Sequence, residues 1–277
     1  MTITAQMVME LRKRTGVGMS NCKEALTEAG GDMEEAIHIL RKKGIASAVK
    51  KGGRETNEGM IGAFENAEKV SLLEVNAETD FVIQNDRFKE FIDQLGVDLL
   101  KGNAQDVETF LAQKSSHQAS MTIDDFRAET VLSLGENIKI RRLITVKKSK
   151  ELSIGVYSHM GGKIVSLIVI KGEGDHTSLA KEIAMHVAAE APEYLKPEDV
   201  PAAVLEKEKE IARSQIKNKP AEIVEKIVHG KLNAFYEQSC LLNQKFVKEP
   251  SLTIADYVAR EGKNLALVQF IRWQVGE

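Results

Sequence analysis

One order of secondary-structure signals, two strands followed by a helix and a strand, occurs twice along the chain and restricts the fold more than any other feature. In the first copy, strand-like runs over 60–75 precede a long helix and a strand over 138–146. In the second copy, similar runs over 155–170 precede a helix over 179–191 and a last strand over 265–275. Because a tight turn joins the first two strands of each copy, we expect two small antiparallel sheets covered by helices.

Short matches between the two copies favour an internal duplication. Residues 69–73 (KVSLL) match 165–168 (VSLI), and residues 135–138 (GENI) match 262–265 (GKNL). Two charged helical runs over 197–236 interrupt the second copy, and their narrow apolar seams suit pairing with each other as a protruding hairpin. The apolar residues of these seams are Leu205, Ile211, Ile223, Ile227 and Val228.

The chain therefore reads as an α+β protein of three modules. Residues 1–54 form a three-helix module with a basic linker, residues 55–147 the first half-core, and residues 148–277 the second half-core. A chain of 277 residues is long enough for two or three such modules. Its hydrophobic fraction of 43% and charged fraction of 29% are typical of folded proteins, so extended disorder is not expected.

The N-terminal module shows three short amphipathic helices separated by glycine stops, the last of which is Gly44. Asp32 and Glu35 have the spacing of a capping box, which predicts that the third helix begins near Met33. The turn between the first two helices carries Met19, an apolar side chain that a solvent-exposed loop does not need. We therefore regard Met19 as a candidate contact residue.

A basic stretch over 41–54 follows, with no acidic residue in it. Two interpretations remain open: a patch that binds nucleic acid, or a solvated helix end followed by a mobile linker. The formal net charge of −3 and the pI of about 6.2 give no global field that would attract nucleic acid or an anionic membrane. Any partner must therefore be recognised locally.

The first half-core turns at the end of its second strand. Thr79, Asp80, Phe81 and Val82 follow the apolar strand and place a large ring beside a carboxylate. One interpretation is structural: Thr79 or Asp80 caps a helix, and Phe81 with Val82 holds that helix to the sheet. The other is functional, with the corner acting as a wedge against a partner. A long amphipathic helix follows, and Asp86 is placed to cap it.

Residue patterns for catalysis or metal binding are sparse. The six histidines show no pair at metal-ligand spacing, and Cys22 and Cys240 form no CxxC motif. Gly172 begins a short glycine-rich loop, but Thr177 stands where a dinucleotide fingerprint needs its third glycine, so a turn is the better interpretation. We therefore expect no metal and no cofactor, and the residues give no catalytic group.

Two histidines nevertheless differ in their setting. His186 lies on a predicted helix between Ile183 and Val187 and is expected in or near the core. His159 lies at the tip of a tight hairpin closed by two glycines, where a lone imidazole contributes little to folding. A role for His159 in contacting a partner is therefore open beside a purely structural one.

The N-terminal residues lack the basic and apolar blocks of a signal peptide, and no apolar run approaches the length of a membrane span. The two widely separated cysteines suggest free thiols in a reducing compartment. A cytoplasmic protein without membrane contact is expected.

With these features the chain resembles the bacterial elongation factor Ts family over essentially its whole length. The resemblance rests on three signatures. They are 11–19 (LRKRTGVGM), 74–76 (EVN) with 79–82 (TDFV), and 183–189 (IAMHVAA) with 197–200 (PEDV). Together they are highly specific.

The resemblance implies a guanine-nucleotide exchange factor that binds the GTPase elongation factor Tu and is not an enzyme. It implies that the N-terminal module is similar to a ubiquitin-associated domain and docks on the nucleotide domain through Arg12 and Met19. It further implies that His159 contacts another domain of the GTPase, and that Phe81 is a wedge between helices of the GTPase. The segment implied to dislodge Mg²⁺ beside the nucleotide is Thr79, Asp80, Phe81 and Val82.

The chain also departs from the family pattern. Ser20 follows Met19 where relatives often have a second methionine, and it is expected to cap the second helix. Longer relatives have one more helix after the last strand, which touches the nucleotide domain; since the sequence ends at Glu277, we expect that contact to be absent or replaced. The hairpin over 197–236 could mediate a homodimer, as in some relatives. Two rival functions remain: a ribosome- or RNA-associated protein that uses the basic stretch, and a small-molecule enzyme that uses the loop at Gly172.

Overall fold

The computed structural model describes residues 2–216 and 219–277, and its chain forms two compact units. The first unit consists of Met1–Lys147, Met160–Lys163 and Gln274–Glu277, and the second of Lys148–His159 and Ile164–Trp273. Each unit contains one three-stranded sheet. The separation of residues 1–54 as a module of their own stays a prediction.

The first unit begins with three helices: α1 (Ala5–Thr15), α2 (Met19–Glu28) and α3 (Met33–Lys51). The third begins where predicted, because the Asp32 side chain accepts a hydrogen bond from the Glu35 N–H at 2.9 Å. The reciprocal bond of a capping box is replaced, since the Asp32 N–H donates to the Ala29 carbonyl. Apolar side chains of the helices and of the turn between α1 and α2 form a small core of Val8, Leu11, Val17, Cys22, Ala25, Leu26, Ala36, Ile39 and Leu40.

The prediction that α3 stops at Gly44 is wrong, because the helix continues to Lys51. A Cβ atom at Gly44 would lie 3.1 Å from the carbonyl oxygen of Ala128, so this glycine permits a close approach of two helix backbones. Much of the stretch predicted as a mobile linker is therefore helix packed against a neighbour. Ala48, within that stretch, belongs to the core of the first half-core.

The first sheet has the strand order β1-β2-β3, and its adjacent strands are antiparallel. Its strands are β1 (Glu58–Glu65), β2 (Lys69–Ala77) and β3 (Ile138–Lys147). Between β2 and β3 the chain forms α4 (Asp80–Gln84), α5 (Asp86–Lys101), α6 (Val107–Ala112) and α7 (Ile123–Leu134). The core lies between β2 and the apolar face of α5, whose buried residues include Phe88, Phe91, Ile92, Leu95 and Leu99.

Two local predictions in this region are wrong. The N-cap of α5 is Asn85, whose side chain accepts from the Arg87 N–H at 3.0 Å; Asp86 is already helical, in the first turn. The segment before α7, in which no helix was predicted, contains α6, which Asp106 caps and Phe110 anchors in the core. The first error concerns a helix boundary, where several polar residues in a row leave the cap position undecided. The second concerns a helix of six residues, which is too short to show a periodic apolar pattern.

The second unit repeats the strand order as β4-β5-β8. Its elements are β4 (Leu152–His159), β5 (Ile164–Lys171), α8 (Thr177–Glu190), α11 (Ile254–Glu261) and β8 (Ala266–Gln274). A small second sheet pairs β6 (Lys245–Phe246) with β7 (Glu249–Thr253), and no pattern in the residues had indicated it. The core is formed mainly by β5, α8 and α11. The duplicated α+β core predicted from the repeat is confirmed.

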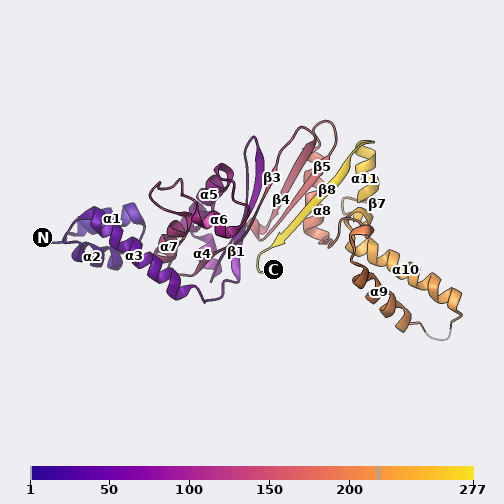
Figure 1. Cartoon of the computed structure of the whole chain (residues 1–277), viewed down its shortest axis with the longest axis horizontal. Helices are drawn as coiled ribbons and strands as arrows, with labels where there is room; N and C mark the ends of the chain where they lie inside the picture. Colours follow the sequence, from indigo (N-terminus) through magenta and orange to yellow (C-terminus); the bar gives the residue numbers. More distant parts are fainter. Residues whose placement is uncertain (1, 217–218) are drawn as a thin grey trace. The chain divides into compact units, whose positions relative to one another are not determined.

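The predicted helical hairpin consists of α9 (Ala202–Ser214) and α10 (Ala221–Ser239), which run side by side (Figure 1). Arg213 donates to Glu225 at 3.0 Å across the pair. The predicted seam is partly wrong: Val228 is buried, but Ile211 and Ile223 are 41% and 43% exposed. Ala212 is buried in place of Ile211. No helix in the described part of the chain combines the length and the apolar composition that a membrane-spanning segment requires.

Candidate functional site

The corner after β2 presents one large apolar side chain on a short, anchored helix. In α4, Val82 and Ile83 are buried, at 8% and 6% exposure, whereas Phe81 is 82% exposed. Asp80 is also exposed, in the first turn, where a carboxylate complements the helix dipole. The structural interpretation of Phe81 as a staple to the sheet is therefore wrong. Val82 and Ile83, and not Phe81, pack α4 against the core.

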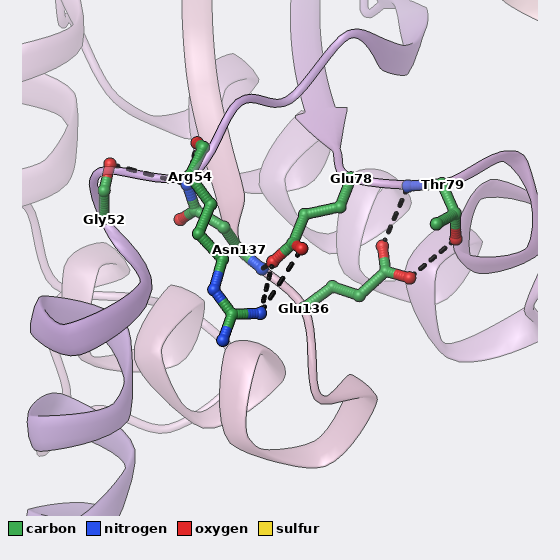
Figure 2. Close-up of polar contacts among 6 residues, drawn as sticks. All are labelled: Gly52, Arg54, Glu78, Thr79, Glu136 and Asn137. Atoms are coloured by element: carbon green, nitrogen blue, oxygen red, sulfur yellow. Dashed lines mark hydrogen bonds and ion pairs between the residues drawn. The ribbon is translucent and has the colours of Figure 1, made fainter.

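Thr79 precedes α4 and is held by Glu136, which comes from the loop before β3. The Thr79 N–H donates to Glu136 Oε2 at 3.0 Å, and the Thr79 hydroxyl donates to Glu136 Oε1 at 2.6 Å (Figure 2). The Thr79 side chain makes no capping bond to α4, although its backbone has the extended conformation of an N-cap residue. Its hydroxyl is directed to the carboxylate, so the expected cap is replaced by a long-range contact.

The residues beside this pair form a second polar cluster (Figure 2). Glu78 accepts from the Asn137 backbone N–H at 2.6 Å and from the Arg54 guanidinium at 3.2 Å. The Asn137 side-chain amide donates to the Arg54 carbonyl at 2.9 Å. The segment after α3, the end of β2 and the loop before β3 are thus joined at the corner. Glu78, Glu136 and Asn137 were not predicted as site residues, although the repeated GENI and GKNL runs contained two of them.

The N-terminal candidates lie on the first two helices. Arg12 is exposed on α1, and Met19 is the first residue of α2, with 41% of its surface exposed. Val17, the other apolar residue of the turn, is buried at 2% exposure and belongs to the core. The expectation that Ser20 caps α2 is wrong: Gly18 occupies the N-cap position, and Ser20 lies within the first turn.

The remaining candidate, His159, ends β4 and is exposed. Its Nδ1 lies 3.3 Å from the Tyr157 hydroxyl, and the two rings stack with centroids 6.0 Å apart. The next residue, Met160, is 70% exposed and has a φ of +50°, in the left-handed region. Sequence reasoning missed Met160, although an apolar residue directly before two glycines of a turn was a usable signal.

Several cations of the basic stretch are paired within the protein. Arg41 forms an ion pair with Asp125, and Lys43 Nζ lies 3.4 Å from Glu28 Oε2. Arg54 is paired with Glu78. Lys51 has a lowered pKa because of burial and the neighbouring positive charge of Arg54. These pairs reduce the positive charge available to a nucleic acid along this stretch.

The buried titratable side chains have structural settings. His186 is fully buried; its Nε2 lies 3.0 Å from Gln244 Oε1, and burial lowers its pKa. Cys22 and Cys240 are free and buried, and burial raises the pKa of the Cys240 thiol to about 11. At the loop after β5, Asp175 accepts from the Thr177 N–H at 2.9 Å, as expected of a turn. Among the described residues, no group of three or more His, Cys, Asp or Glu side chains could hold a metal ion.

Comparison with known proteins places this corner in a family. The model of the family described as "Elongation factor TS" matches residues 78–277, which begin at the corner and include β3 of the first sheet and all three strands of the second. The chain is 53% identical to elongation factor Ts of Protochlamydia amoebophila over 279 aligned residues, covering 99% of each chain. This chain belongs to the elongation factor Ts family. The elongation factors Ts of Chlamydia pneumoniae and Chlamydia caviae are 47% and 46% identical to it, each over 96% of both chains.

Membership in the elongation factor Ts family confirms the resemblance seen in the sequence and identifies a translation elongation factor. The relatives align over nearly the whole length, so the N-terminal helices that precede the family model are shared with them.

Proposed function

We propose that this chain binds elongation factor Tu and accelerates the release of GDP, acting as a binding protein and not as an enzyme. The observation that carries the proposal is Phe81, 82% exposed on a helix whose neighbouring residues are buried. Exposure of an aromatic ring to water is unfavourable, and its burial in a partner lowers the free energy of the complex. Family membership supports the choice of partner, because elongation factors Ts serve translation.

In this proposal the segment Thr79–Val82 enters the GTPase beside its bound nucleotide. Mg²⁺ neutralises the phosphates of a bound nucleotide, so displacing the ion and shifting the backbone around the phosphates favours release. Phe81 acts as the wedge that moves the helices of the GTPase. Asp80, an exposed carboxylate beside the wedge, rearranges the polar groups near the metal.

One wedge is not sufficient for a large effect. Accelerating release about 10⁴-fold needs roughly 5.5 kcal/mol of additional binding in the transition state for release. Burying one phenylalanine supplies about 1.5–3 kcal/mol. Further contacts must therefore hold the GTPase in its distorted state. Arg12 and Met19 on the N-terminal helices, and His159 with Met160 at the β4–β5 turn, are exposed and available for this role.

The test is the release of fluorescent GDP from preloaded elongation factor Tu, measured by stopped flow over a range of concentrations of this chain. We expect the wild-type chain to accelerate release, and excess Mg²⁺ to reduce the acceleration. Asp80→Asn keeps the shape of the side chain and removes its charge, so it should lower the maximal rate of release. A wild-type chain that leaves the rate unchanged would refute the proposal.

A further inference from the structure

We propose that Glu136 is the positioning residue of the exchange site, and that its carboxylate fixes the direction in which α4 presents Asp80 and Phe81. The inference rests on the proposed exchange function and deepens it. Glu136 itself is half-buried and forms two hydrogen bonds with Thr79, so it acts through Thr79.

The contact between Glu136 and Thr79 occupies both oxygens of the carboxylate. One accepts from the Thr79 backbone N–H at 3.0 Å and the other from its hydroxyl at 2.6 Å. Hydrogen bonds to an ionised carboxylate are shorter and stronger than neutral ones, and two of them also restrict rotation. Because one bond reaches the backbone, Glu136 fixes the chain itself at the residue before Asp80. A side-chain contact alone would leave that backbone free to turn.

The helix that carries the wedge needs such support. Helix α4 has five residues, fewer than an isolated helix needs to be stable. Val82 and Ile83 bury one side of it, which fixes its distance from the core. With only these two adjacent side chains buried, α4 could still rotate about the line that joins them. The bonds to Thr79 add an anchor at the N-terminal end and thereby remove that freedom.

Glu136 can transmit rigidity because the residues on both sides of it are fixed. Gly135 has a φ of +81° and ends α7, a conformation that favours glycine. Asn137 is fully buried and is bonded through its backbone to Glu78 and through its side chain to the Arg54 carbonyl (Figure 2). The carboxylate is therefore carried by a loop with few alternative conformations, as a positioning residue requires.

The second half-core supplies an internal comparison. In the matching run 262–265, Lys263 stands where the first copy has Glu136, and it is exposed. The second sheet forms with that lysine, so an acidic residue at this place is not a requirement of the repeated fold. The second copy also passes from β5 to α8 without a short helix like α4. Glu136 and α4 therefore occur together in the first copy, and the second copy has neither.

The test compares Glu136→Gln and Glu136→Ala with the control Lys263→Ala, the matching position of the other copy. Three quantities are measured for each: the maximal rate of GDP release from elongation factor Tu, the concentration that gives half of that rate, and hydrogen exchange of the free chain at Thr79. The melting temperature of each variant is recorded alongside. Glu136→Gln preserves side-chain size and keeps one acceptor, which guards against a variant that fails to fold.

We expect Glu136→Ala to speed hydrogen exchange of the Thr79 amide and to lower the maximal release rate, each by about tenfold. The reason is that a displaced Asp80 and Phe81 should lower the release rate more than the affinity for the GTPase. Glu136→Gln should show a smaller loss, and Lys263→Ala none. The half-saturating concentration should change less than about twofold, since the other exposed contacts are intact. This separation of rate from affinity would not be produced by a merely structural role.

Two results would overturn the inference. One is a Glu136→Ala chain that exchanges the Thr79 amide faster yet keeps the wild-type maximal rate; the proposed function would then stand, because the wild-type chain still accelerates release. The other is a fall in maximal rate that follows the melting temperature across all variants, which would make Glu136 a stability residue. If the wild-type chain itself fails to accelerate release, the proposed function fails and this inference with it.

Discussion

The two half-cores share a sheet and differ at its end. In the first, Gly62 of β1 is paired with Leu73 of β2; in the second, Gly155 of β4 is paired with Ile168 of β5. Leu73 and Ile168 occupy matching positions in the repeated runs, and both are fully buried. A glycine therefore stands opposite the same repeat position in each sheet. This agreement in register supports the duplication more strongly than the short sequence matches.

The two half-cores differ in the connection that follows the central strand of the sheet. After β2 the chain forms α4 and exposes Phe81, whereas after β5 it enters α8 through a turn held by Asp175. The second half-core, residues 148–277, exposes a large apolar side chain, Met160, in the turn that joins its first two strands, and this turn belongs to the first compact unit. The repeated sheet is therefore a scaffold, and the connections carry the features that differ in function.

The largest expected effect is at the corner of the first half. Phe81→Ala should lower the maximal rate of GDP release about 10- to 100-fold, because it removes roughly 1.5–3 kcal/mol of apolar burial. The melting temperature should not change, since the ring is 82% exposed in the free chain. Stopped-flow release and thermal unfolding measure the two quantities. An unchanged release rate would remove the functional distinction between the halves.

The paired glycines provide a test of how tightly each sheet is covered. A Cβ at Gly155 would lie 2.3 Å from the backbone nitrogen of Lys181 in α8, whereas at Gly62 it would meet the half-buried ring of Phe64 at 2.5 Å. A ring can rotate and a helix backbone cannot. Gly155→Ala should therefore lower the free energy of unfolding by about 1–3 kcal/mol, and Gly62→Ala by less.

Urea unfolding followed by circular dichroism measures both glycine variants. Equal losses, or a larger loss for Gly62→Ala, would contradict the view that a helix approaches the second sheet more closely than the first.

A smaller effect is expected at the turn of the second half. Met160→Ala should raise the half-saturating concentration for GDP release about fivefold, corresponding to roughly 1 kcal/mol of lost apolar contact, and leave the maximal rate unchanged. Lys171→Ala, an exposed residue at the far end of β5, is the control. A drop in maximal rate with Met160→Ala would mean that both halves, and not the first alone, act on the nucleotide site.

The smallest effect concerns acid sensitivity. Burial lowers the pKa of His186 from its ordinary value of 6.5, so the unfolded chain takes up a proton at a pH where the folded chain does not. The free energy of unfolding should therefore fall as the pH drops below about 6.5, the ordinary histidine value. His186→Gln should flatten this dependence.

Hydrogen exchange between pH 5 and 8 locates the acid effect, because amides of β5 and α8 should lose protection before those of β2 and α5. Earlier loss in the first half would show that another group dominates. The pH range of the measurement is chosen to bracket the ordinary histidine pKa of about 6.5.

Local pattern predicted most elements of this fold. The spacing of Phe88, Phe91, Ile92, Leu95 and Leu99 identified α5, and strand-like runs identified both sheets. These predictions succeeded because a helix or strand that buries one face has apolar residues at regular spacing along its sequence. The repeated runs likewise indicated the duplication, and the signature residues identified the family. Exposure of the corner was left open between two interpretations.

Tertiary structure decided which groups each candidate side chain contacts. Spacing could not tell that Phe81 is exposed while Val82 beside it is buried, nor that Thr79 bonds to Glu136, 57 residues away. The stop predicted at Gly44 failed for the same reason, since Ala128 packs against that glycine from another helix. Sequence periodicity records which face of an element is buried, but contacts between distant segments depend on how the elements pack. The hydrogen bonds that hold this site in place, from Thr79 to Glu136 and from Asn137 to Glu78, are contacts of this second kind.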